Sequence, residues 1–515
     1  MFVKERGGSL NKLEDYLFWK LAHFLIHKKE YRLLRTSPSQ EELWFEKVEN
    51  KQVPIIRLRR IDLDWSNWLA RDIENSGNNG EAIRRQLIRG EANVLNLYVS
   101  AYPPVDDYDF LLSEKKILKT NVTTKVITRD TYIKEISELE HVFSEEIPLE
   151  SKEEYSLNEI ELLKNATLET AIERIKIEKS LFENGKPFFT YVFIVLQIIA
   201  FLFLEWKGGS TNTATLIKYG AKFNPLILEG EWWRFLTPIL LHIGFFHLFM
   251  NTLALYYLGP TIERIYGRMR FLFIYLVAGF SGSLASFLFT TSLSAGASGA
   301  IFGCFGALLY FGLNYRSLFF RTMGFNVLVV IAINLSLGFT IPGIDNAGHL
   351  GGLVGGFLAT AIVHFPKQKK WVQQLLFLFL TLAAMGSVLW YGYANPEKIT
   401  DTQSVMVLSQ VYLQDENYDK AYRLLTNAIQ THQSSAELFF QLSYVEIKRT
   451  DLSSAENHLQ RAIELDPYFH EAYYNLSLIY YELGNKEESL TYAQKAAELA
   501  PDREEYQSFI EKIQE

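Results

Sequence analysis

The chain has 515 residues, enough for several domains, and 48% of them are hydrophobic. Its net charge of −8 leaves no basic surface, so nucleic acid is not an expected partner. Cys304 is the single cysteine, which excludes an internal disulfide and any cysteine-based metal site. We expect neither a metal nor an organic cofactor.

Residues 1–180 predict a soluble α/β domain. Helical patterns cover residues 11–28 and 65–87, and residues 150–185, rich in Glu and Lys, are expected to form helices that lead to the membrane. Apolar runs predict strands in ELWFEKV, VPIIRLRRIDLDW and ANVLNLYVSAY. The acidic stretch PPVDDYDF could hold a divalent cation, but a solvated loop is the favoured interpretation.

Seven apolar segments follow. The first, from Pro187 to Trp206, has twenty residues, and about twenty residues of helix match a hydrocarbon core of about 30 Å. The others lie at residues 240–259, 271–290, 298–314, 325–341, 349–365 and 371–394. These segments predict a polytopic membrane protein.

The distribution of positive charge predicts the orientation. Lys and Arg precede the first span and occupy the connections after the second, fourth and sixth spans, whereas residues 291–297 and 340–348 contain none. By the positive-inside rule the N-terminal domain is cytoplasmic, and an odd number of spans places the C-terminus outside. The first external loop, residues 207–239, carries positive charges and is the exception, because a long structured loop weakens the rule. We predict a multi-pass protein of the plasma membrane.

Polar side chains gather at one depth of these spans. Ser298 begins the fourth span and His349 begins the sixth, and both spans enter from the external side. His247 and Asn251 lie four residues apart in the second span, hence on one face of a helix. Imidazoles at membrane depth are costly unless they line a polar cavity, so we expect these side chains to share one wet site.

Small residues let two of these spans approach closely. Every fourth residue is small along the fourth span from Gly299 and along the sixth span from Gly348. Backbones come together at such stripes, which brings Ser298 within hydrogen-bond reach of His349. Helix packing without chemistry explains the glycines as well, but leaves both histidines unexplained.

With these motifs in this order, residues 187–366 resemble the rhomboid family of intramembrane serine proteases. The resemblance rests on GASG around Ser298, HLFMN in the second span, GHLGG around His349 and a Trp-Arg pair in the first external loop. It implies a six-helix core in which Ser298 is the nucleophile and His349 the general base. It assigns the oxyanion donors to the Ser298 backbone N–H, the His247 ring and the Asn251 amide. The supporting residues it implies are Gly296, Gly299, Phe302 and Gly352.

Residues near these motifs have lesser expected roles. Phe302 takes the position where the family has an aromatic ring on the catalytic imidazole, and plain aromatic packing is an equally good interpretation. Asp345 is expected in an exposed loop rather than in a triad, since the family works with a dyad. His242 is expected to brace the first loop, and residues 232–234, WWR, predict an interfacial anchor.

The C-terminal segment, residues 401–515, repeats every 34 residues. Two sets of positions show this period: Leu408, Leu442 and Leu476, and Ala421, Ala455 and Ser489. The pattern resembles the tetratricopeptide repeat, with three repeats and a capping helix from residue 503. Such an array normally holds a peptide or protein partner, and a spacer is the alternative.

The expected fold is mainly α: a six-helix rhomboid core, a seventh helix, an N-terminal α/β domain and a C-terminal repeat solenoid. The expected function is cleavage of membrane proteins in or next to their transmembrane segments by a Ser-His dyad, and membrane-protein turnover fits this layout. The expected partners are these substrates, the lipid bilayer and a protein or peptide on the repeats. A catalytically silent adaptor that binds transmembrane helices is the alternative, but such a protein should lack Ser298 or His349, and both are present.

Overall fold

The structure is a computed structural model and describes residues 12–515 except 89, 151, 153–154 and 431–434. Contacts divide the chain into two compact units. The first unit comprises Met1–Glu183 with Asn314–Gly324, and the second comprises Asn184–Leu313 with Phe325–Glu515. The α/β domain lies in the first unit, and nearly all of the membrane helices and the repeats lie in the second.

A six-stranded sheet forms the centre of the first unit. Its strands, in the order β1-β2-β3-β4-β6-β5, are β1 (Arg32–Thr36), β2 (Glu42–Glu46), β3 (Ile55–Arg60), β4 (Ala92–Val99), β5 (Lys115–Ile117) and β6 (Thr120–Ile127). β4 runs parallel to β3 and β6, and the other pairs are antiparallel. A parallel pair needs a crossover connection, which α2 (Ser66–Leu87) supplies between β3 and β4.

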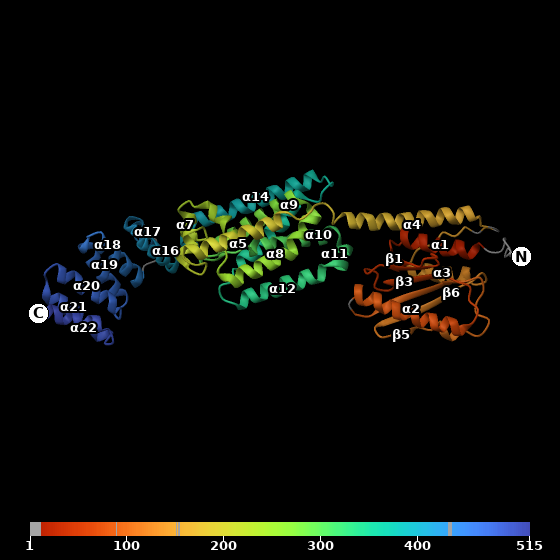
Figure 1. Cartoon of the computed structure of the whole chain (residues 1–515), viewed down its shortest axis with the longest axis horizontal. Helices are drawn as coiled ribbons and strands as arrows, with labels where there is room; N and C mark the ends of the chain where they lie inside the picture. The colour runs from red at the N-terminus through yellow and green to blue at the C-terminus, as the bar shows by residue number, and fades with distance from the viewer. Residues whose placement is uncertain (1–11, 89, 151, 153–154, 431–434) are drawn as a thin grey trace. The chain divides into compact units, whose positions relative to one another are not determined.

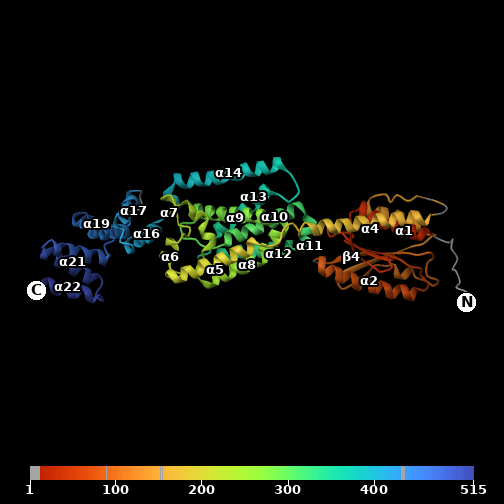
Figure 2. The ribbon, with the colours of Figure 1, turned by 45° about the horizontal axis from the view of Figure 1, so that its top comes forward.

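Helices cover both faces of this sheet (Figure 1). One face packs against α1 (Leu13–His27), α3 (Tyr132–Phe143) and α4 (Leu157–Ser180), and the other packs against α2. Alternate residues of β4 point to opposite faces, so Leu97 enters the first core and Tyr98 the second. Figure 2 shows α4 beside α1, with α2 on the opposite side of β4. The expected α/β fold of this domain is confirmed.

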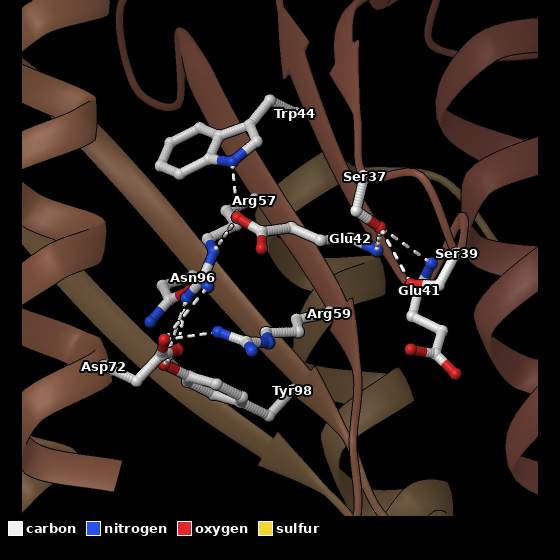
Figure 3. Close-up of polar contacts among 10 residues, drawn as sticks. All are labelled: Ser37, Ser39, Glu41, Glu42, Trp44, Arg57, Arg59, Asp72, Asn96 and Tyr98. Carbon is white, nitrogen blue, oxygen red and sulfur yellow. Dashed lines mark hydrogen bonds and ion pairs between the residues drawn. The ribbon is translucent and has the colours of Figure 1, made fainter. Parts of the chain in front are cut away.

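A buried polar cluster lies between the sheet and α2 (Figure 3). Arg57 donates to Asp72 at 2.7 Å and to Glu42 at 2.9 Å. The same guanidinium donates to Asn96 at 3.3 Å and to the Tyr98 hydroxyl oxygen at 3.1 Å. Because each carboxylate faces a guanidinium, the cluster is neutralised, and it ties α2 to three strands.

α11 (Arg316–Thr322) joins two membrane helices yet belongs to the first unit. Arg321 donates to Glu46 at 3.0 Å and to Glu178 at 2.6 Å. Arg32 lies 3.1 Å from the same Glu178 carboxylate. Since the Glu46 side chain is only 3% exposed, these guanidinium groups compensate a buried charge.

Seven helices of the second unit correspond to the expected spans. They are α5 (Phe189–Lys207), α8 (Gly244–Tyr266), α9 (Arg268–Phe289), α10 (Ser298–Asn314), α12 (Gly324–Thr340), α13 (Asn346–Val363) and α14 (Trp371–Ala394). Four of them, α5, α9, α13 and α14, are long and apolar enough to cross a membrane, and the pair α11–α12 raises the number to up to 5. α10 is a shorter apolar helix. These helices make the chain a multi-pass membrane protein.

A carboxylate from α8 determines where α5 begins. Glu263 is fully buried, and its oxygens accept hydrogen bonds from the backbone N–H of Phe188 at 2.8 Å and of Phe189 at 2.9 Å. The Thr190 hydroxyl donates to the same carboxylate at 2.8 Å. The first N–H groups of a helix have no partner within the helix, so this acid caps α5 and fixes its start against α8.

The C-terminal helices form the expected repeats. The pairs are α16 (Thr402–Gln414) with α17 (Tyr418–Gln430), α18 (Ala436–Lys448) with α19 (Leu452–Leu465), and α20 (His470–Glu482) with α21 (Lys486–Leu499), followed by α22 (Glu504–Gln514). Ala421, Ala455 and Ser489, one per repeat, are fully buried where the paired helices meet. Small residues at these crossings are what the 34-residue period predicts.

Candidate active site

Ser298 is the first residue of α10, and a glycine turn presents it. Gly296 has φ +146, a conformation that favours glycine. A Cβ at Gly296 would lie 2.9 Å from His247 Nε2 and 3.8 Å from Ser298 Oγ. The serine hydroxyl and the His247 ring therefore border one small space, and any larger residue at 296 would fill it.

His247 is oriented by the start of its own helix. The backbone N–H of Ile243 donates to His247 Nδ1 at 3.4 Å. Since Nδ1 then acts as acceptor, the proton of the neutral ring is assigned to Nε2, the nitrogen that faces Gly296. Asn251, one turn later, donates from Nδ2 to the His247 carbonyl at 3.0 Å. The arrangement places an N–H donor beside the Ser298 hydroxyl.

His349 lies in the first turn of α13 and stacks on Phe302 of α10. The two rings are 4.3 Å apart between centroids and tilted by 10°. Phe302 is four residues after Ser298 and so shares its helix face, which brings the imidazole against the face that Ser298 begins. His349 Nδ1 is buried and has no partner within the described part of the chain. No hydrogen bond joins Ser298 to His349 in that part, and catalytic hydrogen bonds often tighten only when substrate binds.

Glycines bring α10 and α13 into backbone contact. A Cβ on Gly352 would lie 2.8 Å from the Cα of Gly299, and a Cβ on Gly356 would collide with Gly303. The carbonyl of Gly348 lies 3.3 Å from a Cβ on Gly299. This close approach is what sets Ser298 and His349 at the same level of the two helices.

Asp345 caps α13. Its Oδ1 accepts a hydrogen bond from the backbone N–H of Gly348 at 2.8 Å, and its carbonyl accepts from the backbone N–H of His349 at 3.0 Å. The carboxylate thus satisfies the helix terminus, and no hydrogen bond connects it to the His349 ring among the described residues. The geometry provides a serine and an imidazole without an orienting carboxylate.

His242 and Arg234 hold the loops around the site. The backbone N–H of Ala297 donates to His242 Nε2 at 3.4 Å, so this imidazole supports the residue before Ser298. Arg234, expected in an interfacial anchor with Trp232 and Trp233, has a side chain that is only 4% exposed and pairs with Glu231 at 2.6 Å. It also donates to the carbonyl of Ile217 at 2.8 Å, which fastens the connection between α5 and α8 to itself.

Two residues near the site were missed from the sequence. Lys222 and Asn224 are fully buried, and both donate hydrogen bonds to the carbonyl of Thr290, in the loop that leads to Ser298. The sequence shows only the charge of Lys222, which was counted among the positive charges expected in the first external loop. A buried lysine is recognised only when the fold around it is known.

The structure offers no metal site in its described part: no group of three or more His, Cys, Asp or Glu is placed to hold an ion. In the acidic stretch PPVDDYDF, Asp106 accepts hydrogen bonds from the backbone N–H of Ser66 at 2.7 Å and from its hydroxyl at 2.5 Å. Asp106 therefore helps to start α2.

One known relative resembles this chain along nearly its whole length, and others match about a third of it. A rhomboid domain family matches residues 229–366, and a tetratricopeptide repeat family matches residues 446–513. Rhomboid protease GluP of Bacillus subtilis (strain 168) is 41% identical over 475 residues, which cover 91% of this chain and 92% of that relative. RHOMBOID-like protein 5 of Arabidopsis thaliana is 34% identical over 190 residues, 36% of this chain and 54% of its own length. Rhomboid-like protease 1 of Toxoplasma gondii is 40% identical over 152 residues, 28% of this chain and 50% of its own length.

Proposed function

Because the chain belongs to the rhomboid family, we propose that it is an intramembrane serine protease that cleaves membrane proteins in or next to their transmembrane segments. Ser298 is the nucleophile and His349 the general base. The observation that carries this proposal is the His349 ring stacked on Phe302, one helical turn after Ser298. That contact brings a base to the face of the helix where the hydroxyl stands.

The dyad works by moving one proton. Ser298 Oγ attacks the scissile carbonyl carbon while the His349 ring accepts the hydroxyl proton. The ring then gives this proton to the leaving amine, and water hydrolyses the acyl-enzyme with the same base. Since Asp345 caps its helix, stacking on Phe302 takes the place of a carboxylate in orienting the imidazole.

The developing oxyanion needs hydrogen-bond donors. We assign them to the backbone N–H of Ser298, the Nε2–H of His247 and the amide of Asn251. The His247 assignment is supported by the hydrogen bond from Ile243 that occupies Nδ1. Removing one donor of this kind typically lowers the rate about 10²- to 10³-fold.

Substrates enter between membrane helices in this proposal. α12 presents many apolar side chains outward, among them Ile333 at 52% and Phe339 at 74% exposed, and Val327 and Ile331 are the only large side chains of this helix that are buried. A weakly held helix is suited to move aside, with residues 340–348 as a cap. A substrate helix protects its own amides, so segments rich in small, helix-weak residues should unwind into the site most easily.

The α/β domain and the repeats lie on opposite sides of the membrane in this proposal. The α/β domain is cytoplasmic, the repeats are outside the cell, and the enzyme resides in the plasma membrane. The repeats hold a protein or peptide partner that brings substrates to the core. The cellular task we assign to this arrangement is turnover of membrane proteins.

The test uses the purified full chain reconstituted with a single-span model substrate. Ser298→Ala and His349→Ala should each abolish cleavage while keeping the thermal unfolding of the unaltered protein. A fluorophosphonate should label Ser298, as located by mass spectrometry, and Ser298→Ala should remain unlabelled. Undiminished cleavage by either variant rules out the dyad, whereas substrate binding by the unaltered chain without any cleavage favours the adaptor alternative.

A further inference from the structure

The loop that leads to Ser298 is fastened to one short segment of the first external loop. The backbones of Lys222 and Ser294 exchange two hydrogen bonds, at 2.8 and 3.0 Å. Lys222 Nζ donates to the carbonyls of Thr290 at 2.6 Å and Ser292 at 3.1 Å. Further along, the N–H of Gly296 donates to the carbonyl of Pro238 at 2.9 Å. The chain is therefore held at successive points up to the nucleophile.

Asn224 joins three segments at one point. Its Nδ2 donates to the carbonyls of Phe287 at 2.9 Å, Thr290 at 3.1 Å and Ile399 at 2.6 Å. Phe287 is in the last turn of α9, Thr290 begins the loop to Ser298, and Ile399 ends α15 (Pro396–Ile399), just before the first repeat. One fully buried amide thus connects α9, the loop that leads to Ser298, and α15, the short helix before the first repeat.

A lysine is unusual at the fully buried position 222. A fully buried ammonium is costly, and no carboxylate hydrogen-bonds to it in the described part of the chain. Its acceptors are carbonyls of an irregular loop, which need donors when they are buried. The Lys222 side chain therefore fixes the conformation of residues 290–294. An apolar residue of similar length would fill the space but could not donate hydrogen bonds to these carbonyls.

The first repeat is packed onto the same region. The Thr291 hydroxyl donates to Asp401 Oδ2 at 2.6 Å, and the other oxygen of Asp401 caps α16 at Ser404. The Tyr412 hydroxyl donates to Glu229 of the first external loop at 2.9 Å. Phe223 and Leu226 share a hydrophobic core with α16, which includes Leu408. The first repeat therefore packs against the same segment, residues 222–226, that holds the loop leading to Ser298.

We propose that Lys222 and Asn224 are positioning residues for Ser298, and that Asn224 and Thr291 make the reactivity of this serine depend on the first repeat. This inference rests on the proposed protease function, because it assigns a support to that nucleophile. Neither residue touches the substrate. Both act by fixing the loop from which Ser298 Oγ is presented.

Two near-isosteric substitutions test the proposal in the full chain reconstituted with a single-span substrate. Asn224→Asp replaces the donor by an acceptor against three carbonyls, and Thr291→Val removes only the hydrogen bond to Asp401. We expect both to lower kcat at unchanged KM, by about ten- to a hundredfold for the first, since misplacing a reacting group by about 1 Å costs up to about 10²-fold. The rate of fluorophosphonate labelling of Ser298 should fall in parallel.

The matched control is Asn457→Asp, because Asn457 also donates to a backbone carbonyl but is exposed on α19. It should cleave and label like the unaltered chain. If Asn224→Asp does not fold, Thr291→Val alone tests the inference. Position 291 is partly exposed and valine has the shape of threonine, so this variant should fold. Normal kcat and labelling in Thr291→Val, together with an inactive Ser298→Ala, overturn this inference alone, whereas an active Ser298→Ala overturns the protease function itself.

Discussion

The rings of Phe302 and His349 lie parallel, with centroids 4.3 Å apart and planes tilted by 10°. An aromatic pair of this kind contributes about 0.5–1.5 kcal/mol beyond the area it buries. Phe302→Leu should therefore lower kcat/KM about three- to tenfold, because the imidazole loses its orienting surface. Phe302→Tyr keeps the ring and should stay within about threefold of the unaltered enzyme.

Phe311→Leu supplies the control for Phe302→Leu. Phe311 is a fully buried ring on the same helix, and it packs against Phe365 rather than against the His349 ring. Both substitutions remove a similar buried volume, so both should lower thermal stability. Only the change at Phe302 should lower kcat/KM, and an equal loss in both variants would show that stacking has no special role.

Contact between α10 and α13 gives a second prediction. A methyl group on Gly352 would collide with the carbonyl of Gly299, so Gly352→Ala must separate the two helices. The separation moves His349 from the face of Ser298, and we expect at least about a hundredfold loss of cleavage. Gly386→Ala on α14 is the control, because a Cβ there meets nothing within 4 Å. Full activity in Gly352→Ala would mean that this contact does not set the geometry.

Local signals explain which elements were predicted. The seven helices that match the expected spans and the helix pairs of the repeats follow from long apolar runs and a fixed period, each visible within a short window. β1, β5, β6 and α3 were not predicted. β5 has only 3 residues, and β6, TNVTTKVI, becomes a strand because it pairs with β4 over its whole length.

The site residues also fall into those with a local sequence signal and those without one. Ser298 and His349 were assigned from motifs that also place them at helix starts, and the structure has them in the first turns of α10 and α13. The supports could not be predicted, since Lys222 and Asn224 act on carbonyls far along the chain. Arg234 was grouped with Trp232 and Trp233 as an interfacial anchor because Trp prefers the headgroup level. Its hydrogen bonds to carbonyls of its own loop could not be predicted, since they depend on how that loop folds.

Lys222 should make stability depend on pH. Burial lowers the pKa of its ammonium to about 7, and the charges of Asp345 and Asp401 only partly oppose this. The unfolded chain keeps the proton up to a pKa of about 10.4, so between these values it binds more protons than the folded chain. Stability contributed by this residue should therefore rise with pH, by up to about 1.4 kcal/mol per pH unit.

The measurement compares thermal unfolding of the unaltered chain and of Lys222→Met from pH 7 to pH 9. The difference in melting temperature should shift in favour of the unaltered chain as pH rises. Lys218→Met is the control, because the Lys218 side chain is 56% exposed and should show no such trend. A difference that stays constant with pH would mean that Lys222 does not change its protonation in this range.

The last prediction concerns α11 and the soluble domain. Burial raises the pKa of Glu46, and the charge and hydrogen bond of Arg321 oppose that shift. Arg321→Met leaves this carboxylate buried without its main partner, and breaking a buried pair in this way costs about 3–5 kcal/mol. Hydrogen exchange of residues 316–322, followed by mass spectrometry, should become faster, and the soluble domain should unfold at a lower temperature.

Two further variants separate charge from shape at this contact. Arg316→Met changes an exposed arginine of the same helix and should leave exchange unaltered. Adding Glu46→Gln to Arg321→Met removes the uncompensated charge, so the double variant should recover part of the lost stability. Normal exchange in Arg321→Met, or a double variant less stable than the single one, would show that the ion pair does not hold α11 to the domain.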